Sequence, residues 1–262
     1  MASSVSKVKL LDGNKRLDGR GFKDLRDLKI TAGVLKKAQG SAMVEWGRNK
    51  VIAGVYGPRE VFPRHRTDPY RAIINCKYAM APFSSLEEHG RAGPNRRAME
   101  IGKVAKHVFE NTVFTNLFPK TMIDISMEIL QSDGGTRIAG ITAASVAVVD
   151  AGIPVKDLVQ GVSVGKVEGK LVVDLGKTED NFGQSDVPAI VSLRSKEILL
   201  YQMDGMLTKD EIHESLDLIF EAAKVVRQKQ ADALKEKYER IEENVASEKP
   251  SGRSEQGEEE VM

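Results

Sequence analysis

The stretch Gln131-Ser-Asp-Gly-Gly-Thr-Arg-Ile-Ala-Gly140 decides how this chain is organised. Just before it, residues 122–130 place apolar side chains at alternate positions, which predicts a half-buried strand. Just after it, residues 138–149 are small and apolar throughout, which predicts a buried helix. A glycine turn between a strand and a helix leaves free N–H groups at the start of the helix, where an anion is stabilised.

The turn itself carries groups that suit a phosphate. Gly134 and Gly135 allow close approach of the backbone, Thr136 adds a hydroxyl, and Arg137 adds a planar cation. The turn is neither a Walker A loop, because no Gly-Lys-Ser/Thr follows, nor the G-x-G-x-x-G dinucleotide fingerprint. The pattern therefore predicts a phosphate site, with a plain glycine turn between core elements as the alternative.

Composition excludes several classes of protein. The formal net charge of the 262 residues is +1, from 39 basic and 38 acidic side chains, so a nucleic-acid partner would require a local basic patch. Cys76 is the only cysteine, which excludes an internal disulfide, and its strand-like setting indicates a buried structural thiol. No segment approaches the roughly 20 apolar residues of a membrane span, and the N-terminus lacks the apolar core of a signal peptide. We expect a cytoplasmic protein without a membrane partner.

Two irregular segments are rich in basic residues. The first, residues 58–71, follows a predicted hairpin over 41–56 and contains four arginines, a histidine, three prolines and two aromatic residues. Long irregular loops are often functional, and this one predicts contact with an RNA or DNA backbone, with Phe62 or Tyr70 available for stacking. A solvated loop is the alternative.

The second segment precedes a predicted helix. Pro94 and Asn95 fit a helix start, which places Arg96 and Arg97 in the first turn. That end of the helix dipole is unfavourable for cations, so the pair indicates a bound anion. A simple surface arginine pair is the alternative.

Acidic residues gather further along the chain. A predicted hairpin over residues 162–175 runs into a glycine-containing loop that holds Glu179, Asp180 and Asp186. Neighbouring carboxylates can bind a hard divalent cation or supply a general acid. Thr208 to Glu211 is a capping box that begins a helix extending to about residue 243.

Five short motifs occur in a fixed order, and together they cover about residues 16–235. They are Arg16-Leu-Asp-Gly-Arg20, Tyr78-Ala-Met-Ala-Pro-Phe-Ser84, Pro94-Asn-Arg-Arg97, Asp133-Gly-Gly-Thr-Arg137, and Glu179-Asp180 with Asp186. Each is weak alone, but in this order they resemble the RNase PH-like phosphorolytic exoribonucleases, and among these the catalytic subunits of archaeal exosomes.

The resemblance implies an α+β fold of the RNase PH type (ribosomal protein S5 domain 2-like), with two βαβ-rich halves in one unit. Residues 16–153 would form RNase PH domain 1 and residues 154–243 domain 2 with a long C-terminal helix, since Gly152 to Pro154 marks a plausible boundary. Residues 1–15 would be a flexible N-terminus and residues 244–262 a disordered tail.

The resemblance also implies partners. Single-stranded RNA would thread through a six-membered ring in which the active subunit alternates with an inactive RNase PH-like paralogue, under a cap of S1/KH-type subunits. Site residues carry over as well. The phosphate site would be Arg97, Gly135, Thr136 and Arg137; Arg64, Arg66 and Arg96 would hold RNA, partly across the subunit boundary; and Asp180 and Asp186 would be catalytic and would bind Mg²⁺.

The implied reaction is attack of inorganic phosphate, the co-substrate, on the last phosphodiester of RNA, releasing a nucleoside 5′-diphosphate. Two anions must be brought together, which requires cations and N–H groups, and the leaving 3′-oxygen needs a proton or a metal ion. Three alternatives remain open: a homohexameric RNase PH that trims tRNA 3′ ends, a small-molecule kinase, and a non-catalytic RNA-binding ring subunit. The kinase would need a nucleotide loop that the sequence lacks, and the non-catalytic subunit would lack the acidic pair.

Overall fold

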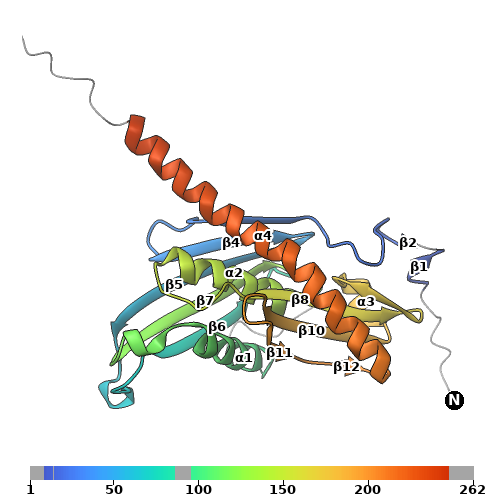
Figure 1. The fold of residues 1–262 in the computed structure, drawn as a ribbon, viewed down its shortest axis with the longest axis horizontal. Helices are drawn as coiled ribbons and strands as arrows, with labels where there is room; N and C mark the ends of the chain where they lie inside the picture. Colours follow the sequence, from blue (N-terminus) through green and yellow to red (C-terminus); the bar gives the residue numbers. More distant parts are fainter. Residues whose placement is uncertain (1–8, 14, 86–95, 248–262) are drawn as a thin grey trace, which may run out of the picture.

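Two sheets and one central helix organise the computed structural model, which describes residues 9–13, 15–85 and 96–247 (Figure 1). The first sheet has the order β3-β4-β5-β7-β6, and the second has the order β11-β10-β8-β9 with β12 paired to β10. The strands of the first sheet are β3 (Leu28–Ala32), β4 (Gly40–Trp46), β5 (Asn49–Glu60), β6 (Ile73–Met80) and β7 (Thr121–Gln131). Those of the second are β8 (Gln160–Val167), β9 (Lys170–Val173), β10 (Ser185–Ser192), β11 (Glu197–Tyr201) and β12 (Asp204–Gly205).

The helices connect and cover these sheets. They are α1 (Arg96–Thr112), α2 (Thr136–Asp150), α3 (Lys177–Phe182) and α4 (Lys209–Ser247), with short 3₁₀ turns η1 (Arg64–Arg66) and η2 (Thr115–Leu117). Strand β6, helix α1 and strand β7 form a βαβ unit, since β6 and β7 are parallel. Within the described residues, every strand pair of the second sheet is antiparallel. The βαβ character thus resides in the first half of the chain.

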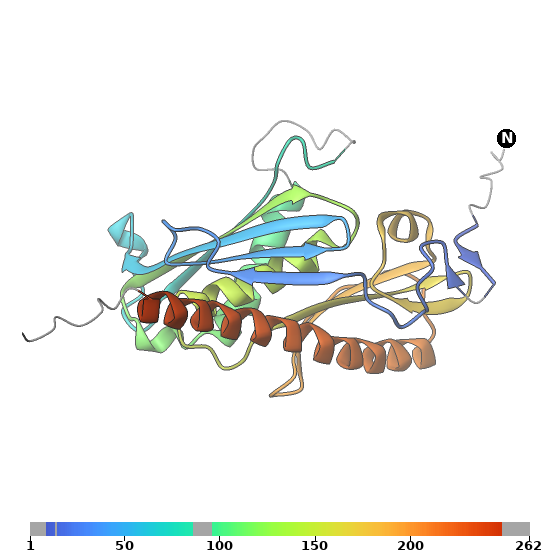
Figure 2. The same cartoon turned by 90° about the horizontal axis from the view of Figure 1, so that it is seen from above.

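Helix α2 is the centre of the core. Nearly all of its side chains are buried, as the small apolar run predicts, and it contacts strands of both sheets. Helix α4 lies across β3 and β8 (Figure 2), and its C-terminal end extends past the sheets (Figure 1). The predicted capping box is present, because Thr208 N donates to Glu211 Oε2 (2.8 Å) and Glu211 N donates to Thr208 Oγ1 (3.3 Å).

The predicted strand–turn–helix unit and both hairpins are confirmed by β7 with α2, β4 with β5, and β8 with β9. The acidic segment differs from prediction, because it forms helix α3 and the start of β10 rather than a loop. Leu10 and Leu11, within the segment predicted to be flexible, are buried, and Leu11 begins the short strand pair β1 (Leu11–Asp12) and β2 (Lys15–Arg16). Pro94, Asn95 and residues 248–262 lie outside the described residues, whereas α4 continues to Ser247.

Among the described residues, no helix is both long and apolar enough to cross a lipid bilayer. Cys76 lies in β6, and burial raises the pKa of its thiol far above the ordinary value. A thiol with a raised pKa is a poor nucleophile, in agreement with its predicted structural role.

Candidate active site

Residues 133–137 comprise the turn that follows β7 and the first two residues of α2, and they are hereafter the phosphate loop. Gly134 and Gly135 have positive φ angles of 75° and 69°, a conformation that favours glycine. A Cβ atom at position 134 would lie only 2.7 Å from the backbone nitrogen of Lys177, the first residue of α3. The phosphate loop therefore packs directly on the segment that begins α3, and glycine is required for this approach.

Thr136 is the first residue of α2 and is buried. Its Oγ1 accepts a hydrogen bond of 2.9 Å from the Tyr78 hydroxyl, which comes from β6. Burial raises the pKa of Tyr78, and the nearby charge of Arg97 opposes this rise. Arg97 is exposed in the first turn of α1 and lies close to the same hydroxyl. The Tyr78 hydroxyl thus connects the phosphate loop to the start of α1.

The guanidinium of Arg137 contacts two side chains, Gln202 and Glu100. Its Nη1 donates to the Gln202 side-chain oxygen, and its Nη2 lies 3.7 Å from Glu100 Oε1. Gln202 in turn donates to Glu100 (3.2 Å). Within the described part of the chain, the buried Nε of Arg137 has no hydrogen-bond partner. The guanidinium is therefore oriented by two side chains and keeps an unused donor for an anion.

Asp180 in α3 and Asp186 in β10 share a hydrogen bond between their carboxyl groups. Burial is the main cause that raises the pKa of Asp186, to about 7, and the negative charge of Asp180 adds to it. Burial also raises the pKa of Asp180, while Arg97 opposes that rise. The positive charge of Arg137 opposes the rise in the pKa of both carboxyls. The acidic pair and the two arginines therefore belong to one site.

Glu179 does not join this pair, contrary to the predicted acidic group. It is buried and accepts hydrogen bonds from Arg16, including one of 2.7 Å from Arg16 Nε. Consecutive residues of a helix point about 100° apart, since a turn contains about 3.6 residues. In α3, Glu179 and Asp180 therefore face different neighbours.

The predicted RNA-binding arginines are placed in two regions. Arg96 is exposed beside Arg97 at the start of α1. Arg64 and Arg66 are exposed on η1, which lies at the opposite end of the molecule from α3 in both views (Figures 1 and 2). The structure thus brings Arg97, the phosphate loop, Asp180 and Asp186 together, and it leaves Arg64 and Arg66 apart from them.

The acidic pair can accommodate a divalent cation. Mg²⁺ is usually held by one or two carboxylates with water and substrate oxygens completing its shell, and two carboxyls close enough to share a hydrogen bond fit that arrangement. Within residues 9–13, 15–85 and 96–247, no cluster of three or more histidine, cysteine or acidic side chains could hold a metal ion. Among these residues, the acidic pair is therefore at most a two-carboxylate site.

Comparison with known families defines the class of protein. The RNase PH family models match residues 24–154 (3′ exoribonuclease family, domain 1) and residues 157–222 (3′ exoribonuclease family, domain 2). The chain belongs to the 3′ exoribonuclease family of RNase PH type. The predicted family, α+β fold and exoribonuclease class are thereby confirmed.

Individual relatives are similar over nearly the whole chain. The exosome complex component Rrp41 of Thermococcus kodakarensis is 54% identical over 239 residues, covering 91% of this chain and 96% of the relative. The Thermoplasma acidophilum protein of the same name is 49% identical over 235 residues, covering 89% and 94%.

Solved structures of other proteins have a similar fold. A structure described as the Archaeoglobus fulgidus exosome with RNA bound to the active site contains a chain with a TM-score of 0.71 and 27% identity, covering 82% of this chain and 92% of that one. Rice Rrp46 has a TM-score of 0.75 at 23% identity, covering 84% and 100%, a likeness that concerns the fold alone.

Proposed function

We propose that this chain is the catalytic subunit of an exosome ring and degrades RNA from the 3′ end by phosphorolysis. One observation carries the proposal: the phosphate loop packs on the start of α3. Arg97 and Arg137 therefore lie close enough to the acidic pair, Asp180 and Asp186, for their charges to affect its pKa values. A loop suited to an anion, beside an acidic pair whose pKa values are raised, can support the transfer of a terminal nucleotide from RNA onto phosphate. The similarity to Rrp41 chains over about nine-tenths of the sequence supports the same conclusion.

Inorganic phosphate binds at the N-terminus of α2. The free N–H groups of Gly135 and Thr136, the Thr136 hydroxyl and the unused donor of Arg137 surround it, and Arg97 approaches from α1. These cations and dipoles allow the phosphate and the RNA phosphodiester to approach each other despite their like charges.

A phosphate oxygen then forms a bond to the terminal phosphorus of the RNA, and the bond from that phosphorus to the 3′-oxygen of the preceding nucleotide breaks. The leaving oxygen takes a proton, and a nucleoside 5′-diphosphate is released. One carboxyl of the acidic pair donates this proton, as expected of an acid whose pKa lies near the working pH. A Mg²⁺ ion held by the carboxyl that stays ionised would stabilise negative charge on the reacting oxygens.

RNA approaches the site past Arg96 at the start of α1. Arg64 and Arg66 lie too far from α3 to serve the same site, so they contact RNA that leads to another active site of the ring. In the proposed ring, this chain alternates with an inactive RNase PH-like paralogue, and S1/KH-type subunits form the cap. The reaction is reversible and adds 3′ tails when nucleoside diphosphates are abundant.

The test is RNA degradation by the chain alone and with its paralogue, with and without inorganic phosphate. We expect nucleoside diphosphates only when phosphate is present. Asp180→Ala should abolish their release, whereas Asp232→Ala, at an exposed position on α4, should not change it. Nucleoside monophosphates without added phosphate would show hydrolysis and contradict the proposal. A homohexameric RNase PH would instead show full activity for the chain alone on tRNA 3′ ends.

A further inference from the structure

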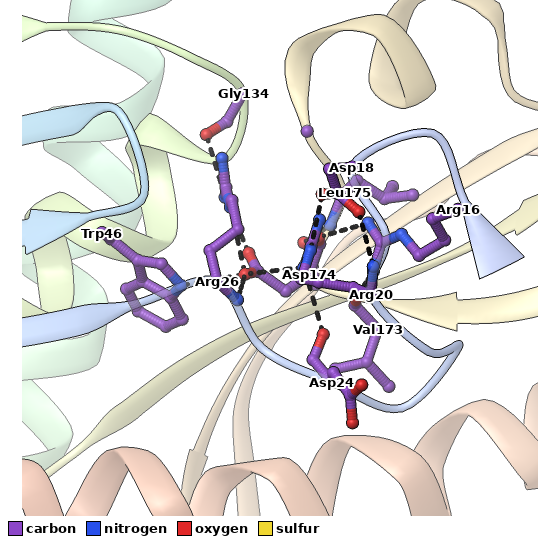
Figure 3. A network of polar contacts seen from close by, with 12 residues as sticks. Arg16, Asp18, Arg20, Asp24, Arg26, Trp46, Gly134, Val173, Asp174 and Leu175 are labelled. Atoms are coloured by element: carbon purple, nitrogen blue, oxygen red, sulfur yellow. Dashed lines mark hydrogen bonds and ion pairs between the residues drawn. The ribbon is translucent and has the colours of Figure 1, made fainter. Parts of the chain in front are cut away.

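The N-terminal motif Arg16-Leu-Asp-Gly-Arg20 has no part in the chemistry proposed above. In the structure it belongs to a buried network in which arginines of the N-terminal segment surround Asp174, next to β9 (Figure 3). This network contacts the phosphate loop on one side of the active site and the start of α3 on the other.

Asp174 is the buried centre of the network and is fully shielded from solvent. Its Oδ1 accepts a hydrogen bond of 2.7 Å from Arg26 Nη2. Its Oδ2 accepts hydrogen bonds from the Arg26 backbone N–H (2.7 Å) and from Trp46 Nε1 (3.0 Å). Removing a partner from such a buried charge leaves it uncompensated, which is strongly unfavourable. The Arg26 side chain is therefore fixed in place by Asp174.

The other side of Arg26 holds the phosphate loop. Its Nη1 donates to the Asp133 carbonyl oxygen (2.6 Å), and its Nη2 also lies 3.4 Å from the Gly134 carbonyl oxygen. Asn49, buried at the start of β5, completes the contact. Its Nδ2 donates to the Gly134 carbonyl oxygen (2.5 Å) and its Oδ1 accepts from the Asp133 N–H (2.5 Å). The carbonyl groups of Asp133 and Gly134 therefore point toward Arg26 and Asn49. The N–H groups that follow, at the start of α2, stay available for an anion.

Arg16 holds the opposite side of the site. Its guanidinium donates to the carbonyl oxygens of Val173 (2.5 Å) and Asp174 (2.7 Å), and to Glu179. Glu179 Oε2 in turn accepts from the Gly176 N–H (2.8 Å), which fixes the first turn of α3. Asp180 follows Glu179 directly, so its position depends on this contact.

We propose that Arg16, Arg26, Asp174 and Glu179, with Asn49, form an inter-loop bracket that sets the spacing between the phosphate loop and the acidic pair. Arg26 is its central positioning residue. It acts by holding Asp133 and Gly134 at a fixed distance from α3. Arginine suits this task because its planar fork can serve a carboxylate and two carbonyls at once, which a lysine ammonium cannot. The inference rests on the proposed phosphorolytic function.

The experiment compares Arg26→Gln and Arg26→Lys with Arg227→Gln in the assembled complex. Arg227 of α4 also forms an ion pair with a buried aspartate, Asp157 (2.9 Å), although its side chain is 37% exposed whereas that of Arg26 is 8% exposed. It is therefore a control for loss of an arginine–aspartate pair away from the active site. A misplacement of about 1 Å can lower the rate by roughly 100-fold, so we expect both Arg26 variants to reduce kcat/KM for inorganic phosphate to that extent. RNA affinity should not change, and Arg227→Gln should keep the wild-type kcat/KM.

Wild-type kcat/KM for phosphate in folded Arg26→Gln would overturn the inference. If the Arg26 variants do not fold, Asn49→Ala decides instead, because it removes contacts to the phosphate loop and leaves Asp174 paired: a large loss supports the bracket and wild-type kinetics overturn it. If the wild-type complex shows no phosphate-dependent activity, the proposed function fails but the bracket is still tested. Hydrogen exchange at residues 133–136 and 176–180 should then be faster in Arg26→Gln than in Arg227→Gln, and equal rates would refute it.

Discussion

The phosphate loop and the basic segment, residues 58–71, both connect regular elements and both contain arginines, but they are held very differently. The basic segment begins at the end of β5 and includes η1, so it is less irregular than predicted. The phosphate loop is fixed by Arg26, Asn49 and Tyr78, all distant in the sequence. In the basic segment, Arg64 pairs only with Glu60 among the described contacts, and its side chain is 85% exposed. Phe62 and Tyr70 are likewise more than four-fifths exposed.

This difference indicates two kinds of binding. Donors that are fixed before the ligand arrives stabilise a small anion and its transition state without further reorganisation. Exposed arginines and aromatic rings suit a flexible strand, whose backbone and bases offer charge and stacking surfaces at variable positions. We therefore expect substitutions in the phosphate loop to affect the chemical step, and substitutions in the basic segment to affect RNA affinity.

Among substitutions that compare the two regions, the largest effect is expected for Arg137→Ala. Arg137 is oriented by Gln202 and Glu100 toward the acidic pair, and removal of one preorganised donor to developing charge costs roughly 100- to 1,000-fold in kcat. The measurement is the rate of nucleoside diphosphate release at saturating RNA. Arg194→Ala, at an exposed arginine beside β10, is the control. A loss confined to RNA affinity would remove the distinction between the two regions.

A smaller effect is expected at Thr136. Thr136→Ser keeps the hydroxyl that pairs with Tyr78 and should retain near-wild-type activity. Thr136→Val has the same shape without the hydroxyl. A hydrogen bond to a charged group contributes about 1.5–3 kcal/mol, so KM for phosphate should rise roughly 10- to 100-fold at about 1.4 kcal/mol per factor of ten. Equal behaviour of the two variants would show that the hydroxyl does not contact phosphate.

The same contrast explains how much could be predicted from the sequence. The strand, glycine turn and helix around Gly134 follow from local periodicity, so they were predicted with their anion-binding role. Helix α3 was missed because six residues with glycines at both ends resemble a loop. The contacts of Arg26 and Gln202 join residues 107 and 65 positions apart, and no local pattern reports such pairs. Tyr78 belongs to one of the five sequence motifs, but its contact with Thr136 depends on where β6 places it.

The basic segment should respond more weakly. Arg64→Ala with Arg66→Ala removes two cations, and each lost contact with a single-strand phosphate reduces the salt slope of RNA affinity by about 0.7. We expect weaker RNA binding by the assembled complex with an unchanged kcat at saturating RNA. Lys224→Ala with Arg240→Ala removes the same charge from exposed positions on α4. If both pairs of substitutions had the same effect, general charge and not the basic segment would explain the binding.

The smallest effect concerns stability and tests the acidic pair without RNA. Burial and Asp180 raise the pKa of Asp186 to about 7, from an ordinary value of 3.8. The folded protein then binds more protons than the unfolded chain between these two values, so this carboxyl lowers the free energy of unfolding as pH rises from about 4 to about 7. Asp186→Asn has no carboxyl to titrate, so it does not lose this part of the free energy of unfolding as pH rises.

In metal-free buffer, Asp186→Asn should therefore melt above the wild type at pH 8, and the difference should shrink toward pH 5. The buried asparagine amide recovers only part of this loss, because an amide also loses water on burial. A net gain of about 1 kcal/mol corresponds to about 2–4 °C in a domain of this size. Mg²⁺ competes with the shared proton, so it should raise the wild-type Tm more at pH 8 than at pH 6 and leave Asp186→Asn unchanged. A Mg²⁺ response equal in the two proteins would place the cation elsewhere, and the acidic pair would then act through its proton alone.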